Sequence, residues 1–367
     1  MDSRIQSVGA VATEAFKELK KIQTGESPLV KTGEEMIDCH IGGLLPGDVV
    51  TLAGAPSSGK SETLYRMLSK MMDVSVNKNA MNFVSLEYSF EMKILNKLVR
   101  KAHNLLNKKK SAIISETFTE EEKPIIKAYA ESLKDDRRYV CQSPITSEEF
   151  YTITKQFCIE HKDKEAILIS IDHLLLFAGS DKQLLLEKVC EAINLLKIEF
   201  TNVYFFPLSQ LNRTSTLLPK DKDNSMMPNN SMLFGSSFIE HLSSYIVIIT
   251  NPFLSGISQY LKVSINRFPW LEDFYGEIDN KGRVSFKTLG NLFYFVTKMR
   301  ESDNSFKNLF VRAMDLSEDQ RKRMEAAVVE SNDIPAPVTA PPVFDMTNFN
   351  TSAISNAQGG DFDEPPF

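Results

Sequence analysis

Cysteine and histidine are scarce in this chain, and neither residue clusters. The four cysteines (Cys39, Cys141, Cys158 and Cys190) stand far apart without a C-x-x-C pair, and the five histidines are equally scattered. Disulfide frameworks and zinc sites need such residues at short, regular spacings. We therefore expect reduced, mostly buried thiols in a cytoplasmic protein, and no zinc.

Long apolar runs are also missing. The longest run, Ala166 to Gly179, is interrupted by Asp172 and His173, whereas a membrane helix needs about 20 apolar residues. The start of the chain, Met1 to Arg4, does not have the pattern of a secretory signal. We expect no membrane association and a cytoplasmic location, which includes the host cytoplasm if the protein is viral.

Lysine and arginine are absent from residues 331–367, which contain five acidic residues. Without this segment the net charge changes from −6 to −1, so residues 1–330 carry no overall excess of positive charge. Any nucleic-acid site must therefore be a local channel lined by basic residues. Proline, asparagine, serine and alanine dominate from Asn332 onward. This composition cannot form a core and predicts a disordered acidic tail.

One stretch predicts a phosphate-binding loop of the form G-x-x-x-x-G-K-[ST]. It consists of Gly54, Ala55, Pro56, Ser57, Ser58, Gly59, Lys60 and Ser61. An apolar run, Val49–Ala53, precedes it, and a helical pattern, Glu62–Leu68, follows it. In a strand-loop-helix unit, backbone N–H groups and the positive helix end converge on one point. We expect ATP there, with Lys60 on the β- and γ-phosphates and Ser61 on Mg²⁺.

Apolar strand patterns alternate with helical patterns through the centre of the chain. This alternation predicts an α/β fold with a mostly parallel sheet covered by helices on both faces. The candidate strands are Val49–Ala53, Met81–Leu86, Ala166–Ile171, Val203–Leu208, Tyr245–Thr250 and Tyr260–Ile265. The candidate helices include Glu91–Leu106 and Gln183–Phe200, and residues 117–160 are expected to be a charged helical insert.

The expected organisation has four parts. Residues 1–35 are a helix and connector, 36–287 the ATPase core, 288–330 a helical extension and 331–367 the tail. Apolar residues at steps of three and four over residues 4–22 predict the first helix. Its apolar face must dock, either on its own domain or on a neighbouring subunit. Ser317 and Gln320 form a capping box that predicts a helix in the extension.

Polar residues follow four of the candidate strands. Glu87 at a strand end suits a base or a group that orients the attacking water. A solvated glutamate in a loop would give the same sequence pattern and is the alternative. Asp172 after an apolar strand is typical of a Mg²⁺ anchor, because burying an unpaired charge is costly. Gln210 could hydrogen-bond the γ-phosphate. Arg213 could contact phosphate or a neighbouring acid, and Arg267 is either an arginine finger for a neighbouring site or a surface residue.

The order of these segments resembles the RecA-type motor domain of DnaB-like replicative helicases over about residues 10–287. The resemblance is carried by Ile41–Asp48, Ser85-Leu86-Glu87, Ser209-Gln210-Leu211-Asn212-Arg213 and Gly235–Glu240. It implies a RecA-like P-loop core without the family's N-terminal domain. Residues 1–35 then correspond to the linker helix that docks on the adjacent subunit.

The resemblance also implies a function. It implies an ATP- and Mg²⁺-dependent DNA helicase, a hexameric ring that moves 5′ to 3′ on single-stranded DNA during replication. In this reading Glu87 polarises water, Asp172 positions Mg²⁺, Gln210 senses the γ-phosphate and Arg267 is the finger. DNA-facing loops would lie near Ala178–Gln183 and Thr214–Ser236. The candidate DNA contacts are Lys182, Arg213, Lys220 and Lys222.

The sequence departs from the family pattern at two places. Ile265 stands where the family has a lysine two residues before the finger, and Met232-Leu233-Phe234 replaces Asp-Leu-Arg. Two alternative functions stay open from the residues alone. One is a RecA- or RadA-like recombination ATPase, and the other is an accessory protein that uses ATP as an assembly switch.

The end of the chain, Gly359 to Phe367, resembles the acidic, phenylalanine-ending tip of bacterial single-stranded-DNA-binding proteins. A mobile tether with an aromatic side chain and a free carboxylate suits a small basic pocket on a replication partner. The candidate docking residues are Asp361, Phe362, Asp363 and Phe367. An acidic tail that only aids solubility is the alternative.

Overall fold

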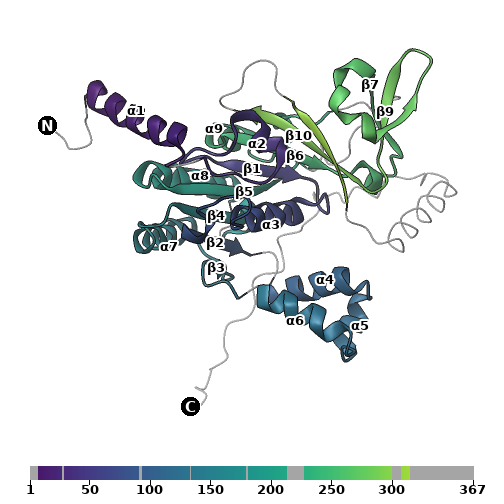
Figure 1. Ribbon diagram of the computed structural model, residues 1–367, viewed down its shortest axis with the longest axis horizontal. Coiled ribbons are helices and arrows are strands. Elements are labelled where there is room, and N and C mark those ends of the chain that lie inside the picture. The colour runs from purple at the N-terminus through teal and green to yellow at the C-terminus, as the bar shows by residue number, and fades with distance from the viewer. Residues whose placement is uncertain are drawn as a thin grey trace, which may run out of the picture.

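An eight-stranded, mostly parallel sheet forms the centre of the fold (Figure 1). The structure is a computed structural model. It describes residues 7–26, 29–90, 93–132, 134–178, 181–212, 227–299 and 307–314. The strand order is β11-β10-β6-β1-β5-β4-β2-β3.

The six strands from β6 to β3 in this order are parallel, which confirms the predicted α/β architecture. They are β1 (Val50–Gly54), β2 (Phe83–Ser89), β3 (Arg138–Cys141), β4 (Ala166–Asp172), β5 (Val203–Gln210) and β6 (Tyr245–Thr250). β1, β4 and β6 are buried at every position. Continuous apolar strands of this kind are stable only when both faces of the sheet are covered.

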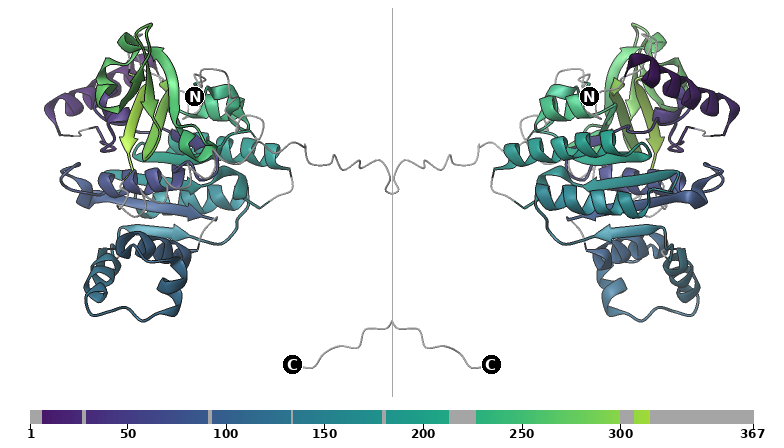
Figure 2. Two further views of the ribbon diagram at one scale, coloured as in Figure 1. Left: turned by 90° about the vertical axis from the view of Figure 1, so that its right-hand side faces the viewer. Right: turned by 90° about the vertical axis from the view of Figure 1, so that its left-hand side faces the viewer.

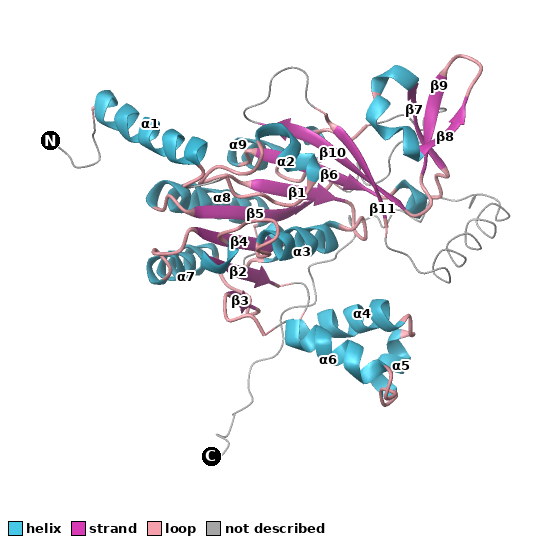
Figure 3. Ribbon diagram, in the orientation of Figure 1, coloured by secondary structure: helices cyan, strands magenta, loops and turns pink. Residues whose placement is uncertain are grey.

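Helices cover both faces of the sheet (Figure 3). One apolar cluster joins the sheet to α7 (Ser147–Glu160), α8 (Lys182–Glu199) and α9 (Ser236–Leu242). The other cluster joins it to α2 (Glu35–Ile41) and α3 (Lys60–Met71). Side chains alternate between the clusters along each strand: Ile167 and Ile169 belong to the first cluster, and Leu168 to the second.

The chain between β2 and β3 forms a separate helical group, here called the insert. It consists of α4 (Ile94–Leu106), α5 (Lys110–Ser115) and α6 (Glu122–Ser132). Both views of Figure 2 show it beside the edge strand β3. The predicted helix Glu91–Leu106 is confirmed as α4 from Ile94 onward, and Glu91 and Met92 lie outside the described residues. The expected helical insert over 117–160 is correct for α6 and α7 but wrong for β3, a short and half-exposed edge strand.

The prediction of a helical extension over residues 288–330 is wrong where the structure describes it. β10 (Asn291–Met299) and β11 (Leu309–Ala313) are strands: β10 pairs antiparallel with both β6 and β11. The run Leu292-Phe293-Tyr294-Phe295-Val296 is aromatic and β-branched, which favours a strand. The core sheet therefore continues to Ala313, past the expected boundary at 287. The helix predicted from Ser317 and the predicted tail lie outside the described residues.

The last predicted strand belongs to another sheet. β7 (Gln259–Ser264) pairs with β9 (Arg283–Lys287), which pairs with β8 (Tyr275–Ile278), in a three-stranded antiparallel sheet. The other five predicted strands lie in the main sheet.

The predicted N-terminal helix is α1 (Val8–Thr24), with Ser7 as its N-cap. None of its described side chains is buried, and Val8 and Phe16 are 85% and 72% exposed. Figure 1 shows α1 extending away from the sheet. Across the described ranges, no helix combines the length and apolarity that a membrane span requires.

Candidate active site

The phosphate-binding loop connects the end of β1 at Gly54 to the start of α3 at Lys60. A Cβ atom on Gly54 would collide with the carbonyl oxygen of Ile249 and with Ser58 Oγ, so only glycine fits there. Gly59 has a φ of 93°, a left-handed conformation that glycine adopts without strain. Both glycines of the motif are therefore required by the local backbone.

The residues of this loop fit a triphosphate group. The Lys60 ammonium is buried and donates to the carbonyl oxygens of Gly54 (3.0 Å) and Ala55 (2.7 Å), which keeps it beside the loop. Ser58 Oγ is buried and has no hydrogen-bond partner in the part of the chain that the structure describes. The N-terminus of α3 adds its positive dipole. An anion at this point would satisfy groups that the protein alone does not.

The register of the sheet brings the predicted polar residues to one edge beside this loop. Gly54 on β1 is opposite Gln210 on β5. On the next strands, Asp172 of β4 is opposite Ser89 of β2, and Glu87 is opposite Ser170. The parallel strands β1, β5, β4 and β2 are adjacent in this order. Their carboxyl ends therefore place Gln210, Asp172 and Glu87 in one group next to the phosphate loop.

Gln210 is held by a histidine that the sequence did not single out. Its side-chain amide nitrogen lies 3.0 Å from Nε2 of His173, a buried residue. Nδ1 of the same ring accepts a hydrogen bond from the backbone of Leu175 at 3.3 Å. Since His173 directly follows Asp172, its position after the apolar strand was the available signal.

Glu87 is held by two residues that sequence reasoning also missed, Tyr65 and Lys97. Tyr65 donates to Glu87 Oε1 at 2.5 Å, and Lys97 Nζ lies 2.5 Å from the same oxygen. Burial and the negative charge of Asp172 raise the pKa of Glu87 to about 7. Burial lowers the pKa of Lys97 to about 8. Tyr65 could have been found from its position four residues after Ser61, but no sequence signal indicated Lys97.

Arg267 lies outside this group. It ends the short 3₁₀ turn η6 (Ile265–Arg267) after β7, and its exposed guanidinium contacts Met227 Sδ at 3.6 Å and the ring of Phe268. Figure 1 shows β7 and β9 beyond β10, on the opposite side of the sheet centre from β2. Arg267 is therefore an exposed residue beyond β10, apart from the phosphate loop.

The remaining predicted contacts are only partly described. Lys182 lies in the first turn of α8 and donates to the carbonyl oxygen of Phe177 at 3.3 Å. The DNA-contact candidates Arg213, Lys220 and Lys222 lie outside the described residues. The same holds for the docking candidates Asp361, Phe362, Asp363 and Phe367.

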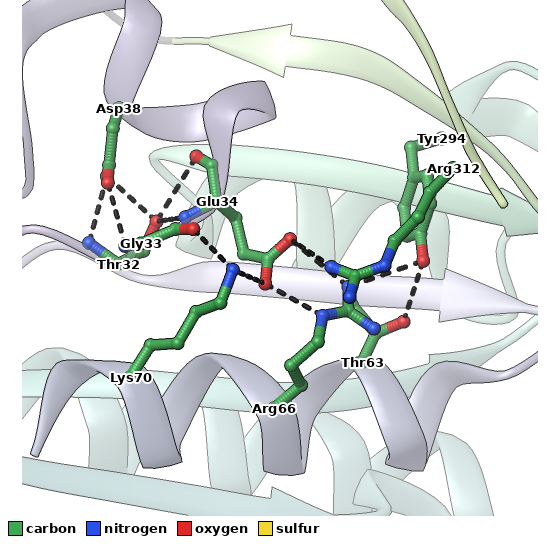
Figure 4. A network of polar contacts seen from close by, with 9 residues as sticks. All are labelled: Thr32, Gly33, Glu34, Asp38, Thr63, Arg66, Lys70, Tyr294 and Arg312. Atoms are coloured by element: carbon green, nitrogen blue, oxygen red, sulfur yellow. Dashed lines mark hydrogen bonds and ion pairs between the residues drawn. The ribbon is translucent and has the colours of Figure 1, made fainter. Parts of the chain in front are cut away.

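A polar network anchors α3 from the side of α2 (Figure 4). Glu34 is buried, and it accepts two hydrogen bonds from Arg66 (2.9 and 3.1 Å) and lies 3.1 Å from Lys70 Nζ. Burial alone would raise the pKa of Glu34, but Arg66 and Lys70 lower it below its usual value. The hydroxyl of Tyr294 on β10 adds contacts to Arg66 and Thr63. The helix that begins at the phosphate loop is thus fixed to the segment before α2 through Glu34 and to β10 through Tyr294.

Residues 30–259 match the family model of the DnaB-like helicase C terminal domain. A solved structure whose title describes an ATPase domain is 15% identical with a TM-score of 0.60, and the similarity covers 86% of this chain and 97% of that one. A second, "The Structure Of A DnaB-Like Replicative Helicase And Its Interactions With Primase", is also 15% identical, with a TM-score of 0.56. This similarity covers 84% of the present chain and 64% of the other. No curated protein sequence matches significantly.

Proposed function

Because this chain belongs to the family of DnaB-like helicases, we propose that it is an ATP-driven motor that unwinds DNA during replication. We further propose that it works as a hexameric ring on single-stranded DNA and moves 5′ to 3′. One observation carries the proposal: the strand register gathers Gln210, Asp172 and Glu87 beside a phosphate loop that fits a triphosphate.

Each residue of the group has a distinct task in ATP hydrolysis. The loop N–H groups and Lys60 hold the β- and γ-phosphates, and Ser61 and Asp172 are the residues that would hold Mg²⁺. When bound there, the ion would neutralise charge on the phosphates. Glu87 orients the attacking water and accepts its proton, for which a pKa of about 7 is suitable. Gln210 senses the γ-phosphate, and its contact with His173 holds its side chain in place.

The active unit would be formed by two adjacent subunits. Arg267 is exposed on its own domain, which suits a finger that reaches a neighbour's γ-phosphate. The exposed apolar face of α1, including Val8 and Phe16, suits docking on a neighbouring subunit. Both features are satisfied when copies of the chain associate in a ring.

Contacts with DNA and with replication proteins complete the proposal. Lys182, Arg213, Lys220 and Lys222 are the candidate DNA-backbone contacts, which would be largely independent of sequence. The acidic end of the chain, with Phe362 and Phe367, is the candidate docking peptide for a replication partner. We propose that the protein acts in the cytoplasm.

Forked DNA with a single bulky roadblock tests this function. A block on the strand with the 5′ tail should stop unwinding, whereas the same block on the other strand should not. Lys60→Ala is the control and should abolish both ATP turnover and unwinding. Electron microscopy with an ATP analogue should show rings of six. Helical filaments on DNA, or ATP turnover without unwinding of any fork, would contradict the helicase function.

A further inference from the structure

The carboxylate of Glu87 forms a hydrogen bond and an ion pair with side chains from two other elements. Tyr65 belongs to α3, the helix that begins at the phosphate loop, and Lys97 belongs to α4 of the insert. Both contact the same oxygen, Oε1. Strand β2, helix α3 and the insert therefore meet at a single carboxylate oxygen.

The three side chains form a closed triangle. Lys97 Nζ also hydrogen-bonds the Tyr65 hydroxyl and lies 4.7 Å from the centre of its ring. The side chains of Lys97 and Glu87 are only 12% and 18% exposed. Charge-assisted hydrogen bonds shielded from water in this way are among the stronger ones in proteins. The position of the Glu87 carboxylate is consequently fixed by contacts outside its own strand.

The position of Tyr65 links this triangle to the nucleotide site. Tyr65 follows Ser61 by four residues on α3, so the two side chains lie on the same face of the helix, one turn apart. The charged groups around Glu87 are Lys97, Arg138 on β3 and Asp172 on β4, and Ser89 of β2 hydrogen-bonds it. Tyr65 and Lys97 are the two residues that contact Oε1 from helices.

We propose that Tyr65 and Lys97 are positioning residues for hydrolysis: they hold the Glu87 carboxylate in the orientation from which it acts on water. This inference rests on the proposed role of Glu87. A displacement of about 1 Å in a reacting group can reduce the rate about 100-fold, so fixing one carboxylate oxygen has a large effect. Through Lys97, the insert becomes part of the active site.

Steady-state ATP turnover with single-stranded DNA tests the proposal, together with binding of a fluorescent ATP analogue. Tyr65→Phe removes only a hydroxyl, and Lys97→Met removes only the charge at similar length. Each should lower kcat roughly tenfold to a hundredfold, with the Kd of the analogue within about threefold of the wild-type value. Lys97→Arg should restore part of the loss. Lys101→Met, one turn further along α4, is the matched control and should leave kcat unchanged.

The background of Glu87→Gln separates positioning from a merely structural role. If the two residues act through Glu87, adding Lys97→Met to Glu87→Gln should produce no further loss. A further loss of tenfold, an unchanged or raised kcat in Lys97→Met and Tyr65→Phe, or an equal loss in Lys101→Met would overturn the proposal. If Lys97→Met fails to fold, Tyr65→Phe tests the proposal by the same comparison of kcat with Kd.

The outcomes also distinguish this inference from the proposed function. If Glu87→Gln turns over ATP at the wild-type rate, the assigned role of Glu87 and the positioning proposal both fall. If Glu87→Gln is inactive while Tyr65→Phe and Lys97→Met are fully active, only the positioning proposal falls.

Discussion

At the scale of single residues, burial makes Glu87 and Lys97 sensitive to pH near neutrality. Their ordinary pKa values are 4.5 and 10.5, and burial moves the two to about 7 and about 8. Burial disfavours the charged form of each group, and Asp172 adds negative charge beside Glu87. The proposed mechanism needs both groups ionised. Both are ionised only over a narrow pH range, between about 7 and about 8.

We expect a bell-shaped dependence of kcat/KM for ATP on pH. The rate should rise as Glu87 loses its proton near pH 7 and fall as Lys97 loses its charge above about pH 8. Lys97→Arg should remove the alkaline fall, because a guanidinium stays charged there. Steady-state turnover from about pH 5.5 to about pH 9.5 measures both limbs. A flat profile across this range would contradict the assignment of the pair.

The sequence predicted those residues whose chemistry is set by their neighbours in the chain. The phosphate loop is a contiguous motif. Asp172 and Gln210 end apolar strands and Glu87 lies two residues before the end of β2, so parallel pairing brings them to the same edge. Tyr65 and Lys97 gain their importance from contacts across 22 and 10 residues of chain. Such contacts depend on how helices pack, which no local pattern encodes.

At the scale of elements, α3 is held by a network of charged side chains in addition to its apolar contacts with the sheet. Glu34 is the acid that faces Arg66, Lys70 and Arg312. Its removal leaves these cations close together without the carboxylate that pairs them. The network thus connects α3 to the segment before α2 and to β11.

We expect Glu34→Gln to destabilise the fold by about 2 kcal/mol at neutral pH, less than for a fully buried pair because Lys70 and Arg312 are partly exposed. The pKa of Glu34 is lowered in the folded state, so its contribution is complete above its unfolded value of 4.5 and is lost as the pH falls. The difference from wild type should therefore shrink below about pH 4.5. Urea unfolding at several pH values measures it.

The neighbouring residue provides the control for this experiment. Glu35 is exposed and pairs at 3.6 Å with Lys307, which is also exposed, so Glu35→Gln should change stability by less than about 0.5 kcal/mol. Equal effects of the two substitutions would show that Glu34 has no special role.

The exposed apolar side of α1 gives a prediction about assembly. Phe16→Glu should leave the fold of the subunit intact, because the Phe16 side chain is 72% exposed, but should weaken ring formation. Thr13→Glu adds the same charge on the polar side of the helix and serves as the control. Analytical ultracentrifugation with an ATP analogue compares the two. Rings of equal stability in both variants would show that α1 docks elsewhere.

Helices and strands were predicted well where the sequence has a clear apolar pattern. They were predicted poorly where the structure depends on which strands pair. Tyr245–Thr250 is an unbroken apolar run, and β6 has the same bounds. β7 was recognised as a strand, but its partner β9 follows it in a local antiparallel sheet, and sequence alternation does not specify partners. Residues 291–299 were misread as helical although their aromatic and β-branched content favours a strand.

At the scale of the whole molecule, the described contacts of Arg267 with Met227 and Phe268 give it no role in its own active site. We expect Arg267→Ala to be inactive alone but to regain some ATP turnover when mixed with inactive Lys60→Ala. An intact site can form where an Arg267 from one protein meets a Lys60 from the other. Turnover in mixtures of the two proteins measures this recovery.

The mixing experiment needs proof of joint assembly and a matched control. Lys287→Ala changes an exposed cation on β9, which pairs with β7 just before Arg267, and should be active without mixing. No recovery in mixtures that demonstrably co-assemble would show that Arg267 serves its own subunit or only the fold.

The central position of β1 has a consequence for how the protein is made. β1 is complete once Gly54 has been synthesised, but its two neighbours begin only at Val203 and Tyr245. Leu292 of β10, which packs against Gly59, is made later still. A chain emerging from the ribosome therefore carries the phosphate-loop strand with both edges unpaired until most of the protein exists. Such late closure slows folding and exposes the unpaired edges and apolar faces of β1 to aggregation. Nascent chains of this protein should therefore depend on chaperones until β6 has emerged.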